Sequence, residues 1–199
     1  MIETSLVIII PGLSDDTKAT EVATRHWSNY GLDTYIFKFG WKDSAKYKDK
    51  LNALLELVDQ KVDEGKKVSL IGISAGASVA VNAYFERKHS IQRVACICGR
   101  LLKGSELGFR TLEKRSTSRP LFADSVLLCE RNLSKLLEND KKKIMTVSAK
   151  FGDELVPAET SKINGAYNIK IPTFEHLISI YACLTLFSKP LLSFLTEVE

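Results

Sequence analysis

A serine between two glycines is the strongest chemical signal in the chain. Residues 72–76 read Gly-Ile-Ser-Ala-Gly, with Ser74 at the centre. An apolar run at residues 68–73 predicts a strand before it, and helical spacing follows it. Small residues at these positions permit a sharp strand-to-helix turn that exposes a serine hydroxyl beside helix N–H groups. Such a serine can be a nucleophile, whereas the alternative is a tight turn that needs only small residues.

A nucleophilic serine needs a base, and the chain has three histidines. His26 falls on the apolar face of a predicted helix, where a histidine is usually part of the core or its rim. His89 follows the far end of the helix that begins at Ser74, about 22 Å away at 1.5 Å per residue. His176 directly follows the last predicted strand, at the same edge of the sheet as Ser74. His176 is therefore the candidate base.

A base of this kind is oriented by an acid, which we expect after the fifth predicted strand. Residues 152–157 read Gly-Asp-Glu-Leu-Val-Pro and place Asp153 in a bend after the glycine. Glu154 is the nearest rival, and Asp124 is a more distant one on a different connection. The structural alternative for Asp153 is a turn residue whose side chain caps the local backbone.

Strand and helix patterns alternate along the whole sequence, which predicts an α/β domain over residues 1–199 with a mostly parallel sheet covered by helices on both faces. The expected strands are residues 5–10, 34–39, 68–73, 94–98, 143–148 and 167–171. Helical stripes are expected before Gly31, after a cap at Asp43 and Ser44, after Ser74, from Phe122 to Leu137, and from His176 to a break at Pro190.

Taken together, these segments resemble the α/β-hydrolase superfamily. The resemblance rests on Ile10-Pro11-Gly12-Leu13 after the first strand, on residues 72–76 and 152–157, and on His176. It covers the chain from Leu6 to the last helix. Two departures are visible: the first loop has Pro11-Gly12 where the family often has His-Gly, and two N-terminal strands of a full-size member are missing. The resemblance implies a minimal version with six strands.

Carried onto this sequence, the resemblance implies Ser74 as nucleophile, Asp153 as orienting acid, and His176 as general base and acid. The backbone N–H groups of Leu13 and Ala75 would form an oxyanion hole. Gly12, beside Leu13, is a candidate substrate contact. No metal and no cofactor are implied.

The implied activity is that of a serine hydrolase acting on an ester or thioester through an acyl-enzyme. Residues 99–142 leave room for a small flap and one helix rather than a cap, so we expect a small or solvent-accessible acyl substrate. Two other interpretations stay open. One is a non-catalytic ligand-binding module on the same fold, and the other is an acyltransferase or small peptidase with the same triad.

The formal net charge of +4 is too small to indicate nucleic-acid binding by itself. Its distribution is uneven, because residues 99–120 hold six Lys or Arg and two Glu. This segment leaves the strand next to Ser74, and Arg100 is its first cation, so we expect Arg100 to contact substrate and to favour acidic ones. The alternative is an ordinary solvated surface.

Compartment and membrane signals are weak. No apolar run approaches the roughly 18 residues that a membrane span requires, and we expect no secretory signal at residues 1–5. The four cysteines have no metal-ligand spacing, and Cys96 and Cys98, two apart in a predicted strand, should face the same side. Buried free thiols and a cytoplasmic setting are therefore expected.

Overall fold

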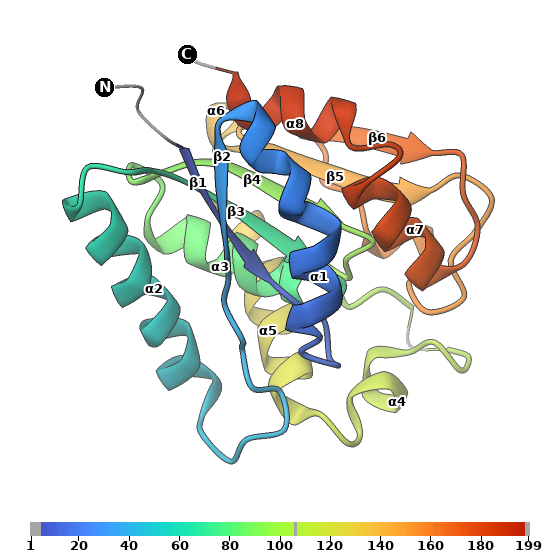
Figure 1. The fold of residues 1–199 in the computed structure, drawn as a ribbon. Coiled ribbons are helices and arrows are strands. Elements are labelled where there is room, and N and C mark those ends of the chain that lie inside the picture. The colour runs from blue at the N-terminus through green and yellow to red at the C-terminus, as the bar shows by residue number, and fades with distance from the viewer. Residues whose placement is uncertain (1–4, 106, 198–199) are drawn as a thin grey trace.

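Six parallel strands form one sheet within the part of the chain that the computed structural model describes, residues 5–105 and 107–197. Their order is β2-β1-β3-β4-β5-β6, so the chain winds outward from β1 in both directions (Figure 1). The expected parallel α/β sheet is confirmed. Residues 1–4, which belong to the segment where we expect no secretory signal, lie outside the described residues. The strands are β1 (Ser5–Ile10), β2 (Leu32–Ile36), β3 (Lys67–Ile73), β4 (Ile91–Ile97), β5 (Ile144–Ala149) and β6 (Tyr167–Ile171).

Helices cover both faces of this sheet, as the alternating pattern predicted (Figure 1). One face packs against α2 (Tyr47–Asp63), α3 (Gly76–Glu86) and α5 (Pro120–Leu133). The other packs against α1 (Thr17–Thr24), the short 3-10 helix η1 (Arg25–Tyr30), α7 (His176–Leu184) and α8 (Lys189–Thr196). The remaining elements lie in connections: α4 (Leu112–Ser116), α6 (Glu138–Lys141) and η2 (Ala158–Thr160).

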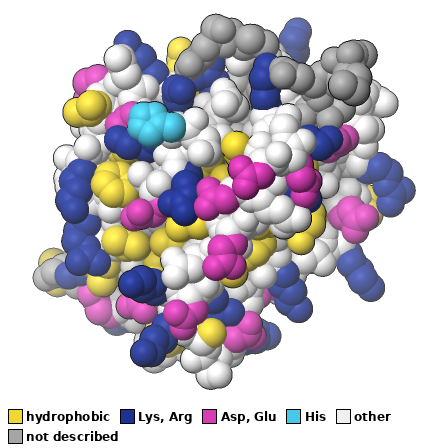
Figure 2. Space-filling view, turned by 90° about the vertical axis from the view of Figure 1, so that its left-hand side faces the viewer, with side chains coloured by type: hydrophobic (Ala, Val, Ile, Leu, Met, Phe, Trp, Pro, Cys, Tyr) yellow, Lys and Arg dark blue, Asp and Glu magenta, His cyan; other side chains and the backbone are white. Residues whose placement is uncertain are grey.

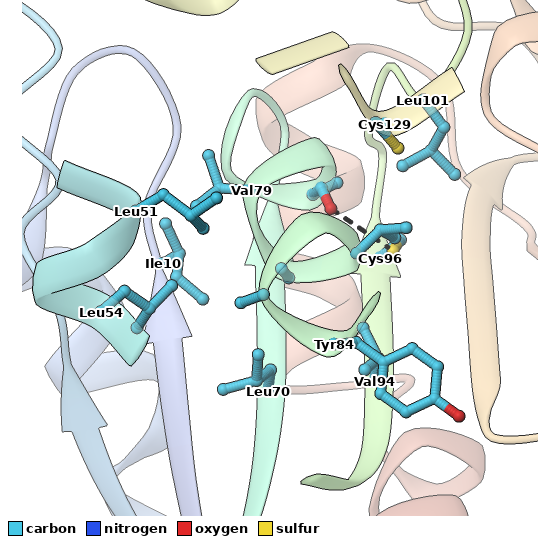
Figure 3. Close-up of a cluster of buried hydrophobic side chains, with 14 of the residues drawn as sticks. Ile10, Leu51, Leu54, Leu70, Val79, Tyr84, Val94, Cys96, Leu101 and Cys129 are labelled. Carbon is cyan, nitrogen blue, oxygen red and sulfur yellow. Dashed lines mark hydrogen bonds between the residues drawn. The ribbon is translucent and has the colours of Figure 1, made fainter. Parts of the chain in front are cut away.

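The two faces explain why β1 is apolar from Leu6 to Ile10. Alternate side chains of a strand point to opposite sides; Ile8 and Ile10 belong to the α2 side, and Val7 and Ile9 to the α7 side. Figure 3 shows Leu51 of α2 beside Ile10 in the first of these layers. Each fully buried aliphatic side chain contributes about 1.5–3 kcal/mol to folding.

A buried polar network joins α3 to its neighbours. The Asn82 amide nitrogen donates to the Tyr47 hydroxyl (2.7 Å) and to the Ser125 carbonyl (2.9 Å), and its oxygen accepts from Asn132 (3.0 Å). Ser78 and Ser125 hydroxyls are 2.8 Å apart. Because unsatisfied buried amides are costly, these bonds fix α3 against α2 and α5.

Some expected boundaries were wrong. Asp43 and Ser44 do not cap α2, which begins at Tyr47 after Lys46, and Asp43 instead pairs with Lys50 at 2.8 Å. The second strand begins and ends earlier than residues 34–39. Leu137 was expected to be buried but is 69% exposed, because α5 ends at Leu133.

The C-terminal helix does break before Pro190, as expected: α7 ends at Leu184, and Pro190 lies in the first turn of α8. In the described part of the chain, no single helix is long and apolar enough to cross a membrane; α7 and α8 meet that test only as a pair bent by 55°.

All four cysteines are buried and free, but Cys96 and Cys98 face opposite sides of the sheet. Cys98 follows the end of β4 with φ of 48°, a left-handed conformation that breaks the strand alternation. The expectation of one shared face was therefore wrong.

Figure 2 shows the face of the molecule on the α2 side. Lys and Arg side chains alternate there with Asp and Glu, with hydrophobic side chains between them. Opposite charges thus lie side by side on this face.

Candidate active site

Ser74 lies in the turn between β3 and α3, at the point where the strand order reverses. In open parallel sheets, ligands bind outside the carboxyl ends of the strands at this reversal, which here falls between β1 and β3. The φ of Ser74 is 54°, and its N–H donates to the Ile97 carbonyl at 2.9 Å. A strained conformation at a serine is uncommon and is held here by its neighbours.

The two flanking glycines are required by close backbone contacts. A Cβ at Gly72 would lie 2.3 Å from the Ala77 Cα, and one at Gly76 would lie 2.1 Å from the Ile10 carbonyl oxygen. Neither position can hold a side chain unless the backbone moves. The spacing of the motif thus follows from packing α3 across β1 and β3.

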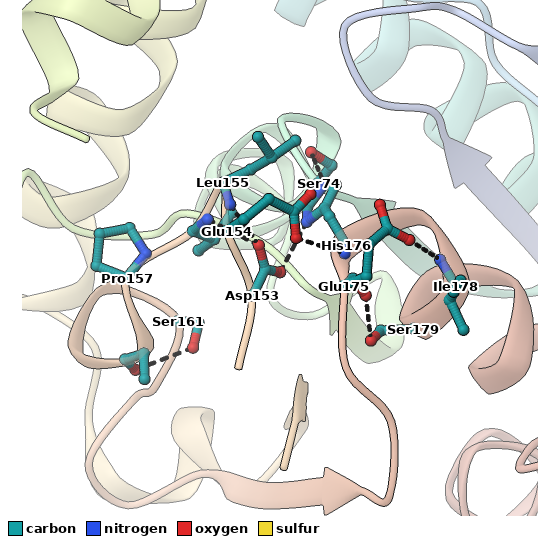
Figure 4. Close-up of polar contacts among 12 residues, drawn as sticks. Ser74, Asp153, Glu154, Leu155, Pro157, Ser161, Glu175, His176, Ile178 and Ser179 are labelled. Atoms are coloured by element: carbon teal, nitrogen blue, oxygen red, sulfur yellow. Dashed lines mark hydrogen bonds and ion pairs between the residues drawn. The ribbon is translucent and has the colours of Figure 1, made fainter. Parts of the chain in front are cut away.

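His176 is the first residue of α7, and Asp153 lies in the loop after β5. The two form a continuous hydrogen-bonded chain with Ser74 (Figure 4). Nε2 of His176 lies 2.8 Å from Oγ of Ser74, and Nδ1 lies 2.7 Å from Oδ2 of Asp153. The side chains of His176 and Asp153 are 3% and 9% exposed. The structure therefore brings together the three side chains that the sequence singled out.

Asp153 is fixed by its own loop. Its Oδ1 accepts the backbone N–H groups of Leu155 (2.8 Å) and Val156 (2.9 Å), while Oδ2 faces the imidazole. Burial raises the pKa of Asp153, but the hydrogen bond and charge of His176 and the two N–H groups outweigh burial, so its pKa lies below the ordinary value. Asp153 therefore makes the hydrogen bonds of a turn residue with one oxygen and faces His176 with the other.

Two glutamates position the histidine backbone. Glu154 Oε2 accepts the His176 backbone N–H at 3.0 Å, and the Glu175 carboxylate accepts the Ile178 N–H at 2.8 Å as the cap of α7. Glu175 has φ of 69°. Glu154, the nearest rival as the acid, thus contacts the main chain of His176 rather than its ring. Asp124 lies on α5, in a different part of the fold.

A cavity of about 200 Å³ lies beside Ser74. Gly12, Leu13 and Ala75 line it, and a Cβ at Gly12 would lie 3.0 Å from the Ser74 Cβ. The loop after β1 therefore passes directly against the serine. The rest of the wall is largely apolar: Ile73, Phe122, Leu155, Val156, Leu177 and Ile180.

Arg100 was expected to contact substrate. It lines this cavity, but its guanidinium is already hydrogen-bonded within the protein. The side chain is 2% exposed, and its guanidinium donates to the carbonyls of Leu102 (3.3 Å), Arg110 (2.6 Å) and Lys103. Arg100 therefore ties together the two ends of a loop. Its neighbour in the same basic segment, Arg115, also reaches the cavity, and the sequence offered no signal beyond charge to single it out.

The other histidines lie elsewhere: His26 packs edge-on against Trp27, and His89 is exposed beyond α3. Among the residues that the structure describes, no group of three or more His, Cys, Asp or Glu side chains could hold a metal ion.

No protein-family model matches the chain, and no curated protein matches it in sequence. Solved structures match it along nearly its whole length. A monoacylglycerol lipase from Paleococcus ferrophilus has a TM-score of 0.69 at 13% identity, over 97% of this chain and 94% of the lipase. The thioesterase domain of the curacin biosynthetic pathway has 0.63 at 14% identity, over 98% and 92%.

A third structure is an alpha/beta hydrolase enzyme, MGS-MChE2, from the metagenome of sediments of the Mar Chica lagoon, Morocco. Its TM-score is 0.61 at 15% identity, over 95% of this chain and 89% of that one. The chain thus has the fold of the α/β-hydrolase superfamily.

Proposed function

We propose that this chain is a serine hydrolase that cleaves esters or thioesters of small acyl groups, acting as a single domain. The observation that carries the proposal is the hydrogen-bonded series from Ser74 through His176 to Asp153. Each member follows a different strand of the sheet, so no local packing rule explains their meeting. A serine, an imidazole and a buried carboxylate in this order activate a hydroxyl for attack.

In the first half-reaction, Ser74 Oγ forms a bond to the substrate carbonyl carbon while its proton passes to Nε2 of His176. Asp153 holds the proton on Nδ1 and stabilises the imidazolium that results. The tetrahedral intermediate then breaks its bond to the alcohol or thiol, which leaves with the Nε2 proton. The acyl group remains on Ser74.

In the second half-reaction, water attacks the acyl-enzyme and gives one proton to Nε2. The bond to Ser74 breaks, Oγ regains that proton, and the carboxylic acid departs. In both halves, negative charge develops on the carbonyl oxygen. We assign its stabilisation to the backbone N–H groups of Leu13 and Ala75, whose residues line the cavity beside Ser74, with the N-terminus of α3 adding positive potential.

The volume of the cavity limits the size of the acyl group that the substrate can carry. An apolar cavity of about 150 Å³ is large enough for benzene, so the space beside Ser74 suits an acyl group of about one aromatic ring or a short aliphatic chain. Its apolar wall would exclude water from the intermediate, which strengthens the electrostatic contacts within it.

The test is labelling with a fluorophosphonate probe and turnover of p-nitrophenyl esters of graded chain length. Ser74→Ala should abolish labelling and reduce turnover by about 10⁴-fold or more. Ser14→Ala is the matched control, because Ser14 lines the same cavity and is expected to have no role in the chemistry. Failure of the folded wild-type protein to react with either reagent would contradict the proposal.

A further inference from the structure

The cavity beside Ser74 has a largely apolar wall and, among the described residues that line it, one exposed cation. Arg115, on α4, lines it and is solvent-exposed. Within residues 5–105 and 107–197, its guanidinium has no hydrogen-bond or ion-pair partner. Figure 1 shows α4 beyond the sheet, on the side toward which the strand arrows point. The Arg115 guanidinium is thus available to a molecule in the cavity.

The other charges near the cavity are already engaged. Arg100 donates to three carbonyls, and Asp16 accepts the Ala19 N–H at 3.1 Å as the cap of α1. Outside the cavity wall, Lys103 pairs with Glu113 (3.7 Å), and Arg110 donates to the Asp153 carbonyl (3.1 Å). Among the described residues, Arg115 therefore differs from these neighbours because it lines the cavity and its guanidinium has no hydrogen-bond or ion-pair partner there.

We infer that the substrates of this site carry an anionic group, such as a carboxylate, which Arg115 binds while the ester carbonyl lies at Ser74. The inference rests on the proposed hydrolase function and narrows it to acidic esters or thioesters. A carboxylate entering an apolar cavity loses water contacts and requires a charged partner. A guanidinium meets this need with two parallel hydrogen bonds.

Arg100, which is buried in the cavity wall, also favours a bound anion over a bound cation. Burial is the main cause that lowers the pKa of Arg100, and the positive charge of Arg115 lowers it further, although Glu113 and Glu159 act in the opposite direction. The two arginines are thus close enough to repel each other. A bound anion would relieve that repulsion, whereas a bound cation would increase it.

The experiment compares kcat/KM for matched charged and neutral esters. One pair is mono-p-nitrophenyl adipate and its methyl ester, which places the charge on the acyl side. The other is 4-carboxyphenyl hexanoate and its methyl ester, which places it on the leaving group. The p-nitrophenyl ester of 6-aminohexanoate adds a cationic substrate. Each is assayed with wild-type, Arg115→Met and Lys114→Met proteins.

Lys114→Met is the matched control, because Lys114 is the adjacent exposed cation on α4 and does not line the cavity. We expect a preference for the charged member of at least one pair, reduced about tenfold to a hundredfold by Arg115→Met, since a hydrogen bond to a charged group contributes about 1.5–3 kcal/mol. Lys114→Met should leave this preference nearly unchanged.

Three results would overturn the inference while leaving the hydrolase intact: equal rates for charged and neutral esters, preference for the cationic ester, or equal losses in the two variants. The last would indicate long-range attraction, which also weakens as the screening length falls from about 10 Å at 0.1 M salt to 3 Å at 1 M. No turnover of any ester would instead contradict the proposed function.

Discussion

Replacing Asp153 by asparagine changes one atom and tests how His176 is oriented. In the native loop, Oδ1 of Asp153 accepts two backbone N–H groups, and Oδ2 faces Nδ1 of His176. An asparagine keeps both backbone bonds only if its oxygen takes the Oδ1 place, which turns its NH₂ toward Nδ1. Nδ1 must then accept, so the imidazole proton moves to Nε2. In that tautomer His176 cannot take the proton of Ser74.

The structure sets the size of the effect. Flipping the amide to recover the productive tautomer leaves the N–H groups of Leu155 and Val156 unsatisfied, at about 1–3 kcal/mol each. The productive fraction therefore falls by a factor of about 30 to 3 × 10⁴. Loss of the carboxylate charge beside the imidazolium adds to this, and in another serine hydrolase the analogous change lowers kcat about 10⁴-fold. We expect a loss on the order of 10⁴.

Glu154→Gln is the control, because its side-chain oxygen can still accept the His176 backbone N–H and the change should cost less than about tenfold. The assay is steady-state hydrolysis of a p-nitrophenyl ester, with thermal unfolding to show that each variant is folded. If Glu154→Gln were the more damaging change, or if Asp153→Asn kept activity within tenfold of wild type, the assignment of Asp153 as the orienting acid would be wrong.

Three further predictions concern folding. Because the pKa of Asp153 is lowered in the folded state, the stability that its ionised form contributes should be constant above about pH 4 and shrink below it; urea unfolding of wild type and Asp153→Asn at pH 3–6 measures the difference. Asn82→Ala should lower the free energy of unfolding by about 3 kcal/mol, against less than about 0.5 kcal/mol for the exposed control Asn164→Ala, and equal losses would contradict the role of the network. Burial raises the pKa of Cys96 and of Cys183 to about 12, so a thiol reagent should detect no cysteine in the native protein and four after unfolding; rapid native labelling would be inconsistent with this.

Much of the fold could be predicted because burial on two faces leaves a readable pattern. The apolar run of β1 and the helical stripe of α2 both indicate which side chains are buried. The meeting of Ser74, Asp153 and His176 was predictable as a set, because all parallel strands end at one edge. Their catalytic roles stay predictions.

Other features depend on contacts that have no period in the sequence. The face of Cys98 follows from a single positive φ, and the start of α2 from an ion pair of Asp43 that competes with capping. Charge alone could not separate Arg100 from Arg115, since only the packing of their segment decides which guanidinium is buried and which reaches the cavity. In irregular segments, tertiary packing decides where each side chain lies.

The hydrogen bonds of Arg100 also bear on where this fold could accept additional residues. By binding the carbonyls of Lys103 and Arg110, its guanidinium closes the base of the loop between them. Once a loop is closed at its base, doubling its length costs only about 0.6 kcal/mol of chain entropy. Ser74, Asp153 and His176 all lie outside this loop. Additional chain could therefore be inserted there while the reacting side chains keep their positions.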